Sequence, residues 1–287
     1  MVRSIGLASG IGAGNSGCGK GPEYFQKHLK IDGETINWQE MILATSDFDD
    51  KYDSLSYLNK KYAQAAYTMA TNEPFFFAFG GDHSCALGLW SGVAEAKRKD
   101  GDIGLIWIDA HMDSHTPQTS ESGNIHGMPV AALLGHGDKR FTDILSANPK
   151  IKPENIFLIG VRSYEAGEAD FLKRMNVRVY HMDEVRQRGL AEILKEVLTA
   201  LSKRTVGYGL SFDLDAIDPS FVTAVGTPES GGIDAESAIE SMKLLAEFPP
   251  IAFEIVEYNP ELDIEGATFE FTKKLINSVM QSVGATK

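Results

Sequence analysis

Short, strongly apolar runs alternate along the chain with longer segments in which apolar residues recur every three or four positions. The short runs have strand length, and the longer segments have helical periodicity. We predict strands at 3–8, 36–43, 74–79, 103–108, 156–161, 177–181, 208–212 and 251–256. Several of these runs have no polar alternation, which is typical of strands that are buried on both faces of a parallel sheet.

Helices are predicted between the strands. The expected helices are a short one opened by Pro22, then 55–72, 84–98, 126–134, 165–175, 187–202, 234–247 and 266–282. Strands that alternate with helices indicate an α/β fold with a doubly wound parallel sheet of about eight strands and helices on both faces. No internal repeat or linker divides the chain, so we expect a single domain over residues 1–287.

The composition excludes several classes of protein. Of the 287 residues, 43% are hydrophobic and 9% aromatic, as in a soluble globular protein. The net charge of −13 argues against a nucleic-acid binder. Cys18 and Cys85 have neither disulfide-framework nor zinc-site spacing. No apolar run reaches membrane-spanning length and no signal peptide is evident, so we expect a cytoplasmic protein that binds no membrane.

A glycine-rich segment follows the first predicted strand, from Gly10 to Gly21. Its glycines match neither the dinucleotide-binding fingerprint nor the phosphate-binding P-loop. We therefore expect a flexible loop near the substrate entrance rather than a nucleotide site.

Ionisable residues follow three of the buried strands. Asp109, His111 and Asp113 alternate after the strand at 103–108, so in extended backbone their side chains point the same way. The carboxyl ends of parallel strands form the usual ligand-binding edge of such a sheet. The predicted strand ends together carry two imidazoles and four carboxylates: His83, Asp109, His111, Asp113, Asp213 and Asp215.

These six residues are suited to bind metal ions. Crowded carboxylates without Lys or Arg repel one another unless cations join them, and four carboxylate charges balance two divalent ions. Oxygen-rich ligation without thiolates favours Mn²⁺, with Mg²⁺, Fe²⁺ and Co²⁺ as alternatives. Two such ions can share a water molecule and lower its pKa, which provides a hydroxide nucleophile without Ser or Cys.

Two further residues fit a hydrolytic site. His126 lies after the central strand and has a side chain suited to proton transfer, although a helix-start histidine bonded to backbone is the alternative. Glu257 ends the last strand and can pair with a planar cation or serve as a buried structural partner. The residues thus predict a dinuclear metal hydrolase. The absence of a basic cluster disfavours a phosphoesterase, and Glu257 favours an amidine hydrolase.

Several sequence strings resemble the ureohydrolase family, which includes arginases and agmatinases. The similar strings are Gly-Gly-Asp-His-Ser at 80–84, Asp-Ala-His-Met-Asp at 109–113, Ser-Phe-Asp-Leu-Asp-Ala-Ile-Asp-Pro at 211–219, Gly-Thr-Pro-Glu-Ser-Gly-Gly at 226–232 and Glu-Tyr-Asn-Pro at 257–260. They occur in the family's order over essentially the whole chain. The resemblance implies a dimanganese centre. One ion would be held by His83, Asp109, Asp113 and Asp213, and the other by His111, Asp109, Asp213 and Asp215.

The loop at 116–127 is most similar to the arginase branch. It contains Thr116-Pro117 and then Ser122-Gly123-Asn124-Ile125-His126-Gly127, whereas agmatinases lack the Ser-Gly-Asn pattern. The resemblance implies that Ser122 and Asn124 bind the substrate carboxylate and that His126 shuttles a proton. It also implies that Thr227 and Glu257 lie beside the guanidinium group.

Two segments depart from the arginase pattern, at three positions. His115 stands where arginases usually have Asn, and Ser163 and Glu165 replace the two Asp residues of an Arg-Asp-x-Asp pattern. Glu165 retains a charge that can reach an α-ammonium, and His115 can still donate to a carboxylate. These changes can also indicate a different guanidino acid, because one buried polar contact shifts specificity strongly.

Our hypothesis is hydrolysis of L-arginine to L-ornithine and urea. A metal-bridging hydroxide would attack the guanidinium carbon, and Asp113 and His126 would help the proton to reach the leaving amine. The nearest alternative is a ureohydrolase acting on agmatine, guanidinobutyrate or a related guanidino compound. A non-catalytic binding subunit on the same scaffold is disfavoured because all six ligands are present. The resemblance also implies a homo-oligomer, either a trimer or a hexamer.

Overall fold

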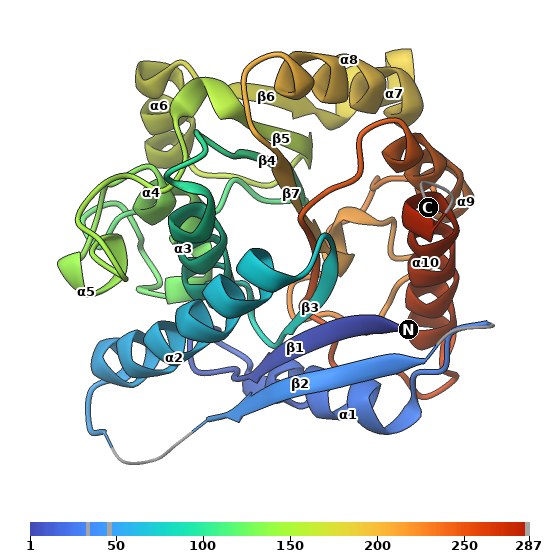
Figure 1. The fold of residues 1–287 in the computed structure, drawn as a ribbon, viewed down its shortest axis with the longest axis horizontal. Helices are drawn as coiled ribbons and strands as arrows, with labels where there is room; N and C mark the ends of the chain where they lie inside the picture. The colour runs from blue at the N-terminus through green and yellow to red at the C-terminus, as the bar shows by residue number, and fades with distance from the viewer. Residues whose placement is uncertain (33–34, 45–47, 285–287) are drawn as a thin grey trace.

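The centre of the molecule is one eight-stranded parallel sheet, which runs edge-on through the middle of the view in Figure 1. This computed structural model describes residues 1–32, 35–44 and 48–284. The strand order is β2-β1-β3-β8-β7-β4-β5-β6. The strands are β1 (Val2–Ala8), β2 (Ile36–Leu43), β3 (Phe76–Gly80), β4 (Gly104–Ile108), β5 (Ile156–Val161), β6 (Arg178–His181), β7 (Tyr208–Asp213) and β8 (Ala252–Val256).

The most apolar runs form the inner strands. All residues of β3, β4, β5, β7 and β8 are buried, because helices cover both sides of the sheet. The edge strands β2 and β6 pair on one side only and carry exposed residues such as Glu40 and His181. Burial on both faces is the reason that these sequences show no polar alternation.

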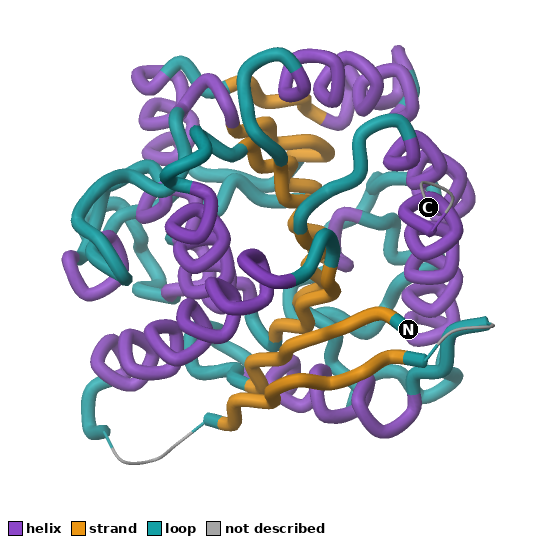
Figure 2. Tube along the Cα trace, in the orientation of Figure 1, coloured by secondary structure: helices purple, strands orange, loops and turns teal. Residues whose placement is uncertain are grey.

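Helices pack on both faces of the sheet, and Figure 2 shows them around the central layer of strands. Each face has its own hydrophobic core. Helices α2 (Lys51–Asn72), α3 (Ala86–Lys97), α4 (Pro129–Leu133) and α6 (Ala166–Met175) contribute to one core. The other core is built with α1 (Gly21–His28), α7 (Met182–Arg188), α8 (Leu190–Ser202), α9 (Ala235–Ser241) and α10 (Ala267–Gly284). The predicted fold class is therefore confirmed.

The predicted helix at 187–202 is wrong in its boundaries. The chain forms α7 and α8 instead, and Gly189 between them has a φ of 85° that no continuous helix allows. The segment predicted as a helix at 234–247 is α9 followed by a 3₁₀ helix at Met242–Ala246. A four-residue helix, α5 (Lys139–Thr142), was not predicted and packs against α2.

The glycine-rich segment is packed against the protein at Gly12, whereas Gly14 to Ser16 are exposed. It contains a 3₁₀ helix at Ser16–Lys20, and Gly12 is buried. The Gly12 amide donates to Asp82 Oδ2 at 2.8 Å, and the Gly12 carbonyl accepts from the amides of Ile125 and His126 at 2.8 and 3.2 Å. The expectation of a flexible loop is thus wrong for Gly12, which joins the end of β3 to the segment that carries His126.

The strand order places four strand ends side by side. β3, β8, β7 and β4 are consecutive neighbours in the sheet although their sequence positions are far apart. Because all the strands are parallel, the residues that follow these four strands meet at one edge. The fold therefore assembles one site from segments near residues 83, 109, 213 and 257.

Within the described ranges, Cys18 and Cys85 are free and buried. None of the helices in these ranges combines the length and apolar character that a membrane crossing requires.

Gly209 allows Trp90 of α3 to lie directly on strand β7. A Cβ atom at this position would come within 1.9 Å of Trp90 Cζ3, so Gly209→Ala forces a fully buried ring to move. We expect a loss of about 1–3 kcal/mol in the free energy of unfolding, the usual cost of overpacking. Urea denaturation measures it. The matched control is Gly284→Ala, where no atom lies within 4 Å of the new Cβ. Equal stability of Gly209→Ala and the parent chain would contradict this packing.

Candidate metal centre and active site

Three strand ends share one local turn. At each, an aspartate side chain accepts the backbone amide two residues later: Asp82 from Ser84 at 2.9 Å, Asp109 from His111 at 2.7 Å and Asp213 from Asp215 at 2.8 Å. Such Asx turns are favoured by a short carboxylate at the end of a strand. In Asp109 and Asp213 the turn uses one oxygen, Oδ1, and leaves Oδ2 facing the site.

The turn after β4 changes how its three ligand candidates converge. The sequence predicts extended backbone through Asp113, but β4 ends at Ile108 and Asp113 has a φ of 45°. The three side chains still approach one edge, although through a turn rather than through strand alternation. Asp113 is one of four described non-glycine residues with positive φ, and Glu257 is another. Backbone strain of this kind is concentrated at functional sites.

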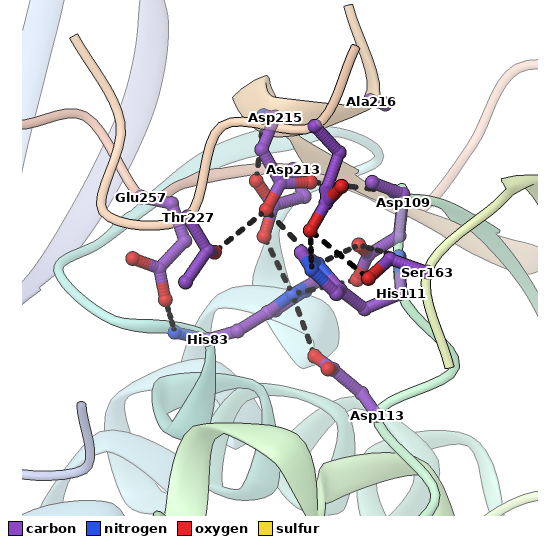
Figure 3. Close-up of polar contacts among 12 residues, drawn as sticks. His83, Asp109, His111, Asp113, Ser163, Asp213, Asp215, Ala216, Thr227 and Glu257 are labelled. Atoms are coloured by element: carbon purple, nitrogen blue, oxygen red, sulfur yellow. Dashed lines mark hydrogen bonds and ion pairs between the residues drawn. The ribbon is translucent and has the colours of Figure 1, made fainter. Parts of the chain in front are cut away.

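One group of ligand candidates surrounds the imidazole of His83 (Figure 3). His83 Nδ1 lies 3.2 Å from Asp109 Oδ2, 3.1 Å from Asp113 Oδ2 and 3.1 Å from Asp213 Oδ2. His83 is buried, yet Nδ1 makes no hydrogen bond within the part of the chain that the structure describes. An unpaired buried nitrogen that faces three carboxylate oxygens has the arrangement of a ligand set for a cation.

The second group surrounds His111. His111 Nδ1 lies 3.1 Å from Asp215 Oδ2 and 3.4 Å from Asp109 Oδ1. Asp109 belongs to both groups and approaches each with a different oxygen. The geometry thus provides two adjacent positions for cations, with Asp109 between them.

The far side of the His83 ring is held by buried polar residues. His83 Nε2 lies 2.9 Å from Ser211 Oγ, and Ser211 Oγ donates to Glu254 Oε2 at 2.6 Å. The Trp90 indole donates to the same Glu254 oxygen at 2.8 Å. This chain fixes the ring so that Nδ1 faces the carboxylates, which is the usual support of a metal-binding histidine.

Trp107 contacts two of the ligand candidates, His83 and Asp109. Its ring stacks on His83 with centroids 4.0 Å apart, and its indole donates to Asp109 Oδ2 at 2.8 Å. The aromatic residue in the apolar run at 103–108 therefore orients two of the ligand candidates.

The electrostatics of the protein groups show an excess of negative charge. Burial and the charge of Asp109 raise the pKa of Asp113 to about 6. Burial, with Asp215 and Asp109, also raises the pKa of Asp213 well above its usual value. Burial lowers the pKa of His111, but Asp215 and Asp109 raise it far more, so the net shift is upward. In this cluster the pKa values of two carboxyl groups and of one imidazole are all raised. Such a cluster fits divalent cations, because their charge stabilises ionised carboxylates and deprotonated imidazoles.

Glu257 connects the metal-binding group to His126. Glu257 Oε1 accepts from the amide of His83 at 2.8 Å and lies 3.1 Å from His126 Nδ1. Burial opposes the charge of Glu257, but the bond with His126 lowers its pKa overall. The same bond outweighs burial at His126 and raises that pKa to about 9. Glu257 Oε2 is buried and has no hydrogen-bond partner among the described residues, so its capacity to accept hydrogen bonds is unused.

A cavity of about 230 Å³ opens beside these groups. It contains every predicted site residue except Asp109, which is fully buried behind it. Thr227 is fixed there by donating to Asp215 Oδ2 at 3.2 Å. No Lys or Arg is among the described residues that line this cavity. The lining residues include His83, His111, Asp113, His115, Ser122, Asn124, His126, Glu165, Asp213, Asp215, Thr227 and Glu257.

His115 and two glutamates form another part of the cavity lining. His115 Nε2 contacts Glu165 and lies 3.3 Å from Glu168 Oε2. Glu168 was not predicted, although the Glu165-x-x-Glu168 spacing at the start of α6 is a capping-box signal. It also accepts from the amide of Ser114 at 3.0 Å. Burial raises the pKa of Glu168 to about 7.

Arg162 and Glu254 were also not predicted as residues that support the site. Arg162 precedes Ser163 and donates to backbone carbonyls of two other segments, among them those of Asp215 and Glu229, both at 2.7 Å. Glu254 is fully buried, and the signal that could have identified it is a charged residue within an otherwise apolar strand.

Comparisons with known proteins show the family to which the chain belongs. The model of the arginase family matches residues 2–282. An arginase from Bacillus caldovelox is 42% identical over 222 residues, which is 77% of this chain and 73% of the relative. A solved arginase from Bacillus subtilis is 34% identical, with a TM-score of 0.88 and 98% of both chains covered.

A solved arginase from Entamoeba histolytica, in complex with L-ornithine, is 28% identical. Its TM-score is 0.87, with 97% of this chain and 98% of that chain covered. The resemblance drawn from the sequence strings is therefore confirmed, and the chain belongs to the arginase family of carbon–nitrogen hydrolases.

Proposed function

We propose that this protein is a dimanganese hydrolase that cleaves L-arginine to L-ornithine and urea. The observation that carries the proposal is the pair of His/Asp groups that share Asp109. His83, Asp113 and Asp213 would hold one ion with Asp109. His111 and Asp215 would hold the other, with Asp109 and Asp213 as bridges. Two bound divalent ions would supply a Lewis acid and a hydroxide nucleophile at neutral pH.

The lining of the cavity favours a cationic substrate. The Oε2 atom of Glu257 and the hydroxyl of Thr227 would contact a guanidinium group beside the ligand candidates, because both residues line the cavity. A carboxylate pairs well with this planar cation, whereas a phosphate would find no Lys or Arg among the described lining residues. We therefore assign guanidinium binding to Glu257 and Thr227.

Proton transfer is assigned to His126 and Asp113. Glu257 accepts the Nδ1–H of His126, which leaves Nε2 as the nitrogen that can exchange a proton with a leaving amine. Asp113 Oδ2 lies 3.1 Å from His83 Nδ1, so its carboxylate would be close enough to accept a proton from water bound between the ligand candidates. Both residues line the cavity.

The amino-acid end of the substrate would bind to the part of the cavity lined by His115 and Glu165. Ser122, Asn124 and His115 offer donors to a carboxylate, and Glu165 offers an acceptor to an ammonium group. The contacts of His115 with Glu165 and Glu168 also favour a second candidate, a ureohydrolase acting on agmatine, guanidinobutyrate or a related guanidino compound. In support of arginine, the similar Entamoeba histolytica arginase was solved with L-ornithine.

We also propose that the protein acts in the cytoplasm as a homo-oligomer, either a trimer or a hexamer. Mass determination in solution tests the subunit count.

The first prediction concerns the shared ligand candidate. Asp109→Ala removes a carboxylate from both His/Asp groups, so we expect loss of bound metal and of nearly all turnover. Metal analysis and a urea-release assay measure the two effects, and circular dichroism confirms the fold. The control is Asp170→Ala, an exposed aspartate on α6. A chelated Asp109→Ala enzyme with full activity would refute the mechanism.

The second prediction separates proton transfer from metal binding. His126→Asn should retain the bound metal but lower kcat by about a hundred-fold or more, as expected when a general acid is removed. Metal content and kcat are measured on the same preparation, with the exposed His136→Asn as the control. An unchanged kcat would remove His126 from the catalytic residues.

The third prediction concerns the substrate. With arginine, agmatine and guanidinobutyrate compared at equal concentration, urea release should be fastest with arginine. If the contacts around His115 exclude an α-amino acid, one of the other compounds will give the higher kcat/KM. That result would replace L-arginine in the proposal and retain the metal chemistry.

A further inference from the structure

The two histidines of the metal centre differ in how their outer nitrogens are supported. Each presents Nδ1 to carboxylates, as the distances to Asp109 show. His83 Nε2 is bonded to Ser211, which Glu254 supports from within the core. His111 Nε2 instead faces Glu229, whose Oε1 lies 3.9 Å away. Glu229 is on the loop between β7 and α9 and belongs to neither His/Asp group.

Ser163 fixes the position of the Glu229 carboxylate. Its hydroxyl donates to Glu229 Oε1 at 3.0 Å, the same oxygen that faces His111. Figure 3 shows Ser163 beside the His111 ring. Although the Glu229 side chain is 40% exposed, this bond holds its oxygen on the side of the metal centre.

Arg162 fixes the backbone that carries Glu229. Its guanidinium donates to the carbonyls of Glu229 and Ser230 at 2.7 and 3.2 Å. It also donates to the carbonyls of Asp215 and Ala216 at 2.7 and 3.2 Å. One planar cation thus ties the Glu229 loop to the turn that contains a ligand candidate, which an ammonium group with three donors could not reproduce.

We propose that Glu229 is a positioning residue for His111, held in place by Ser163 and Arg162. At 3.9 Å the separation is an ion-pair distance rather than a direct hydrogen bond. The carboxylate attracts the Nε2–H end of the ring, which favours the tautomer with an Nδ1 lone pair directed at the second cation position. The inference rests on the metal centre of the proposed function and is independent of which guanidino compound is cleaved.

Glu229→Gln tests the inference because it removes the charge and keeps the shape. We expect Mn²⁺ to bind about ten-fold more weakly at one of two positions and unchanged at the other, the lower end of the usual effect of losing such a partner. Calorimetric titration of metal-stripped protein with Mn²⁺ measures both affinities. At saturating Mn²⁺, KM should equal that of the parent chain. The control is Glu236→Gln, an exposed glutamate on the neighbouring helix α9.

Two further variants distinguish positioning from a structural role. Ser163→Ala should weaken the same Mn²⁺ position, because it releases the Glu229 carboxylate. Ser163→Asp in the Glu229→Gln background should restore affinity, because it returns a carboxylate to the neighbourhood of His111 Nε2. A structural defect caused by the loss of Glu229 would not be repaired in this way.

Three results would overturn the inference. Glu229→Gln with two unchanged Mn²⁺ affinities would exclude the role, whether or not its thermal stability fell. A raised KM with unchanged affinities would show that Glu229 contacts the substrate instead. Failure of the parent chain to bind Mn²⁺ would overturn both this inference and the proposed function, whereas tight binding that Glu229→Gln leaves intact would overturn this inference alone.

Discussion

The structure depends on keeping several carboxylates close together at the end of an apolar sheet. Asp109, Asp113, Asp213 and Asp215 are all buried, and His83 Nδ1 faces three of them within 3.2 Å. Carboxylate oxygens that all approach one nitrogen lie close to one another, and buried like charges in a low-dielectric environment repel strongly. The backbone amides of the Asx turns and the Trp107 indole oppose this repulsion by donating hydrogen bonds to Asp109 and Asp213. Divalent cations would complete the balance, so metal binding and the stability of this edge are linked.

Hydrogen bonds at the same edge of the sheet link the ligand candidates to His126 and to the glycine-rich segment. Glu257 accepts from the amide of His83 and from the ring of His126, so it couples a ligand candidate to the proposed proton carrier. Gly12 receives the amide of His126 and donates to Asp82, next to His83 in sequence. Displacement of any one of these segments would therefore disturb the others. These hydrogen bonds explain why the glycine-rich segment is packed at Gly12.

The sequence predicted the elements and the ligand candidates because both are local signals. Apolar runs identify buried strands, and aspartates and histidines directly after them identify the ligand edge. The strand order was not predictable, because pairing β8 between β3 and β7 is a long-range choice. Gly189 shows a second limit: its single positive φ divides one amphipathic pattern into two helices. Glu254 shows a third, because a charge within an apolar strand has no local signature of its partners, Ser211 and Trp90.

The position of β8 has a consequence for biosynthesis. This strand is the last in the chain, yet it lies between β3 and β7 and joins β2-β1-β3 to β7-β4-β5-β6. Until it leaves the ribosome, the two halves of the sheet have facing, unpaired edges, which are prone to non-native pairing. A nascent chain or a truncated fragment that ends before residue 252 therefore lacks both the central seam and Glu257. The complete centre can form only after the chain has been translated through Glu257.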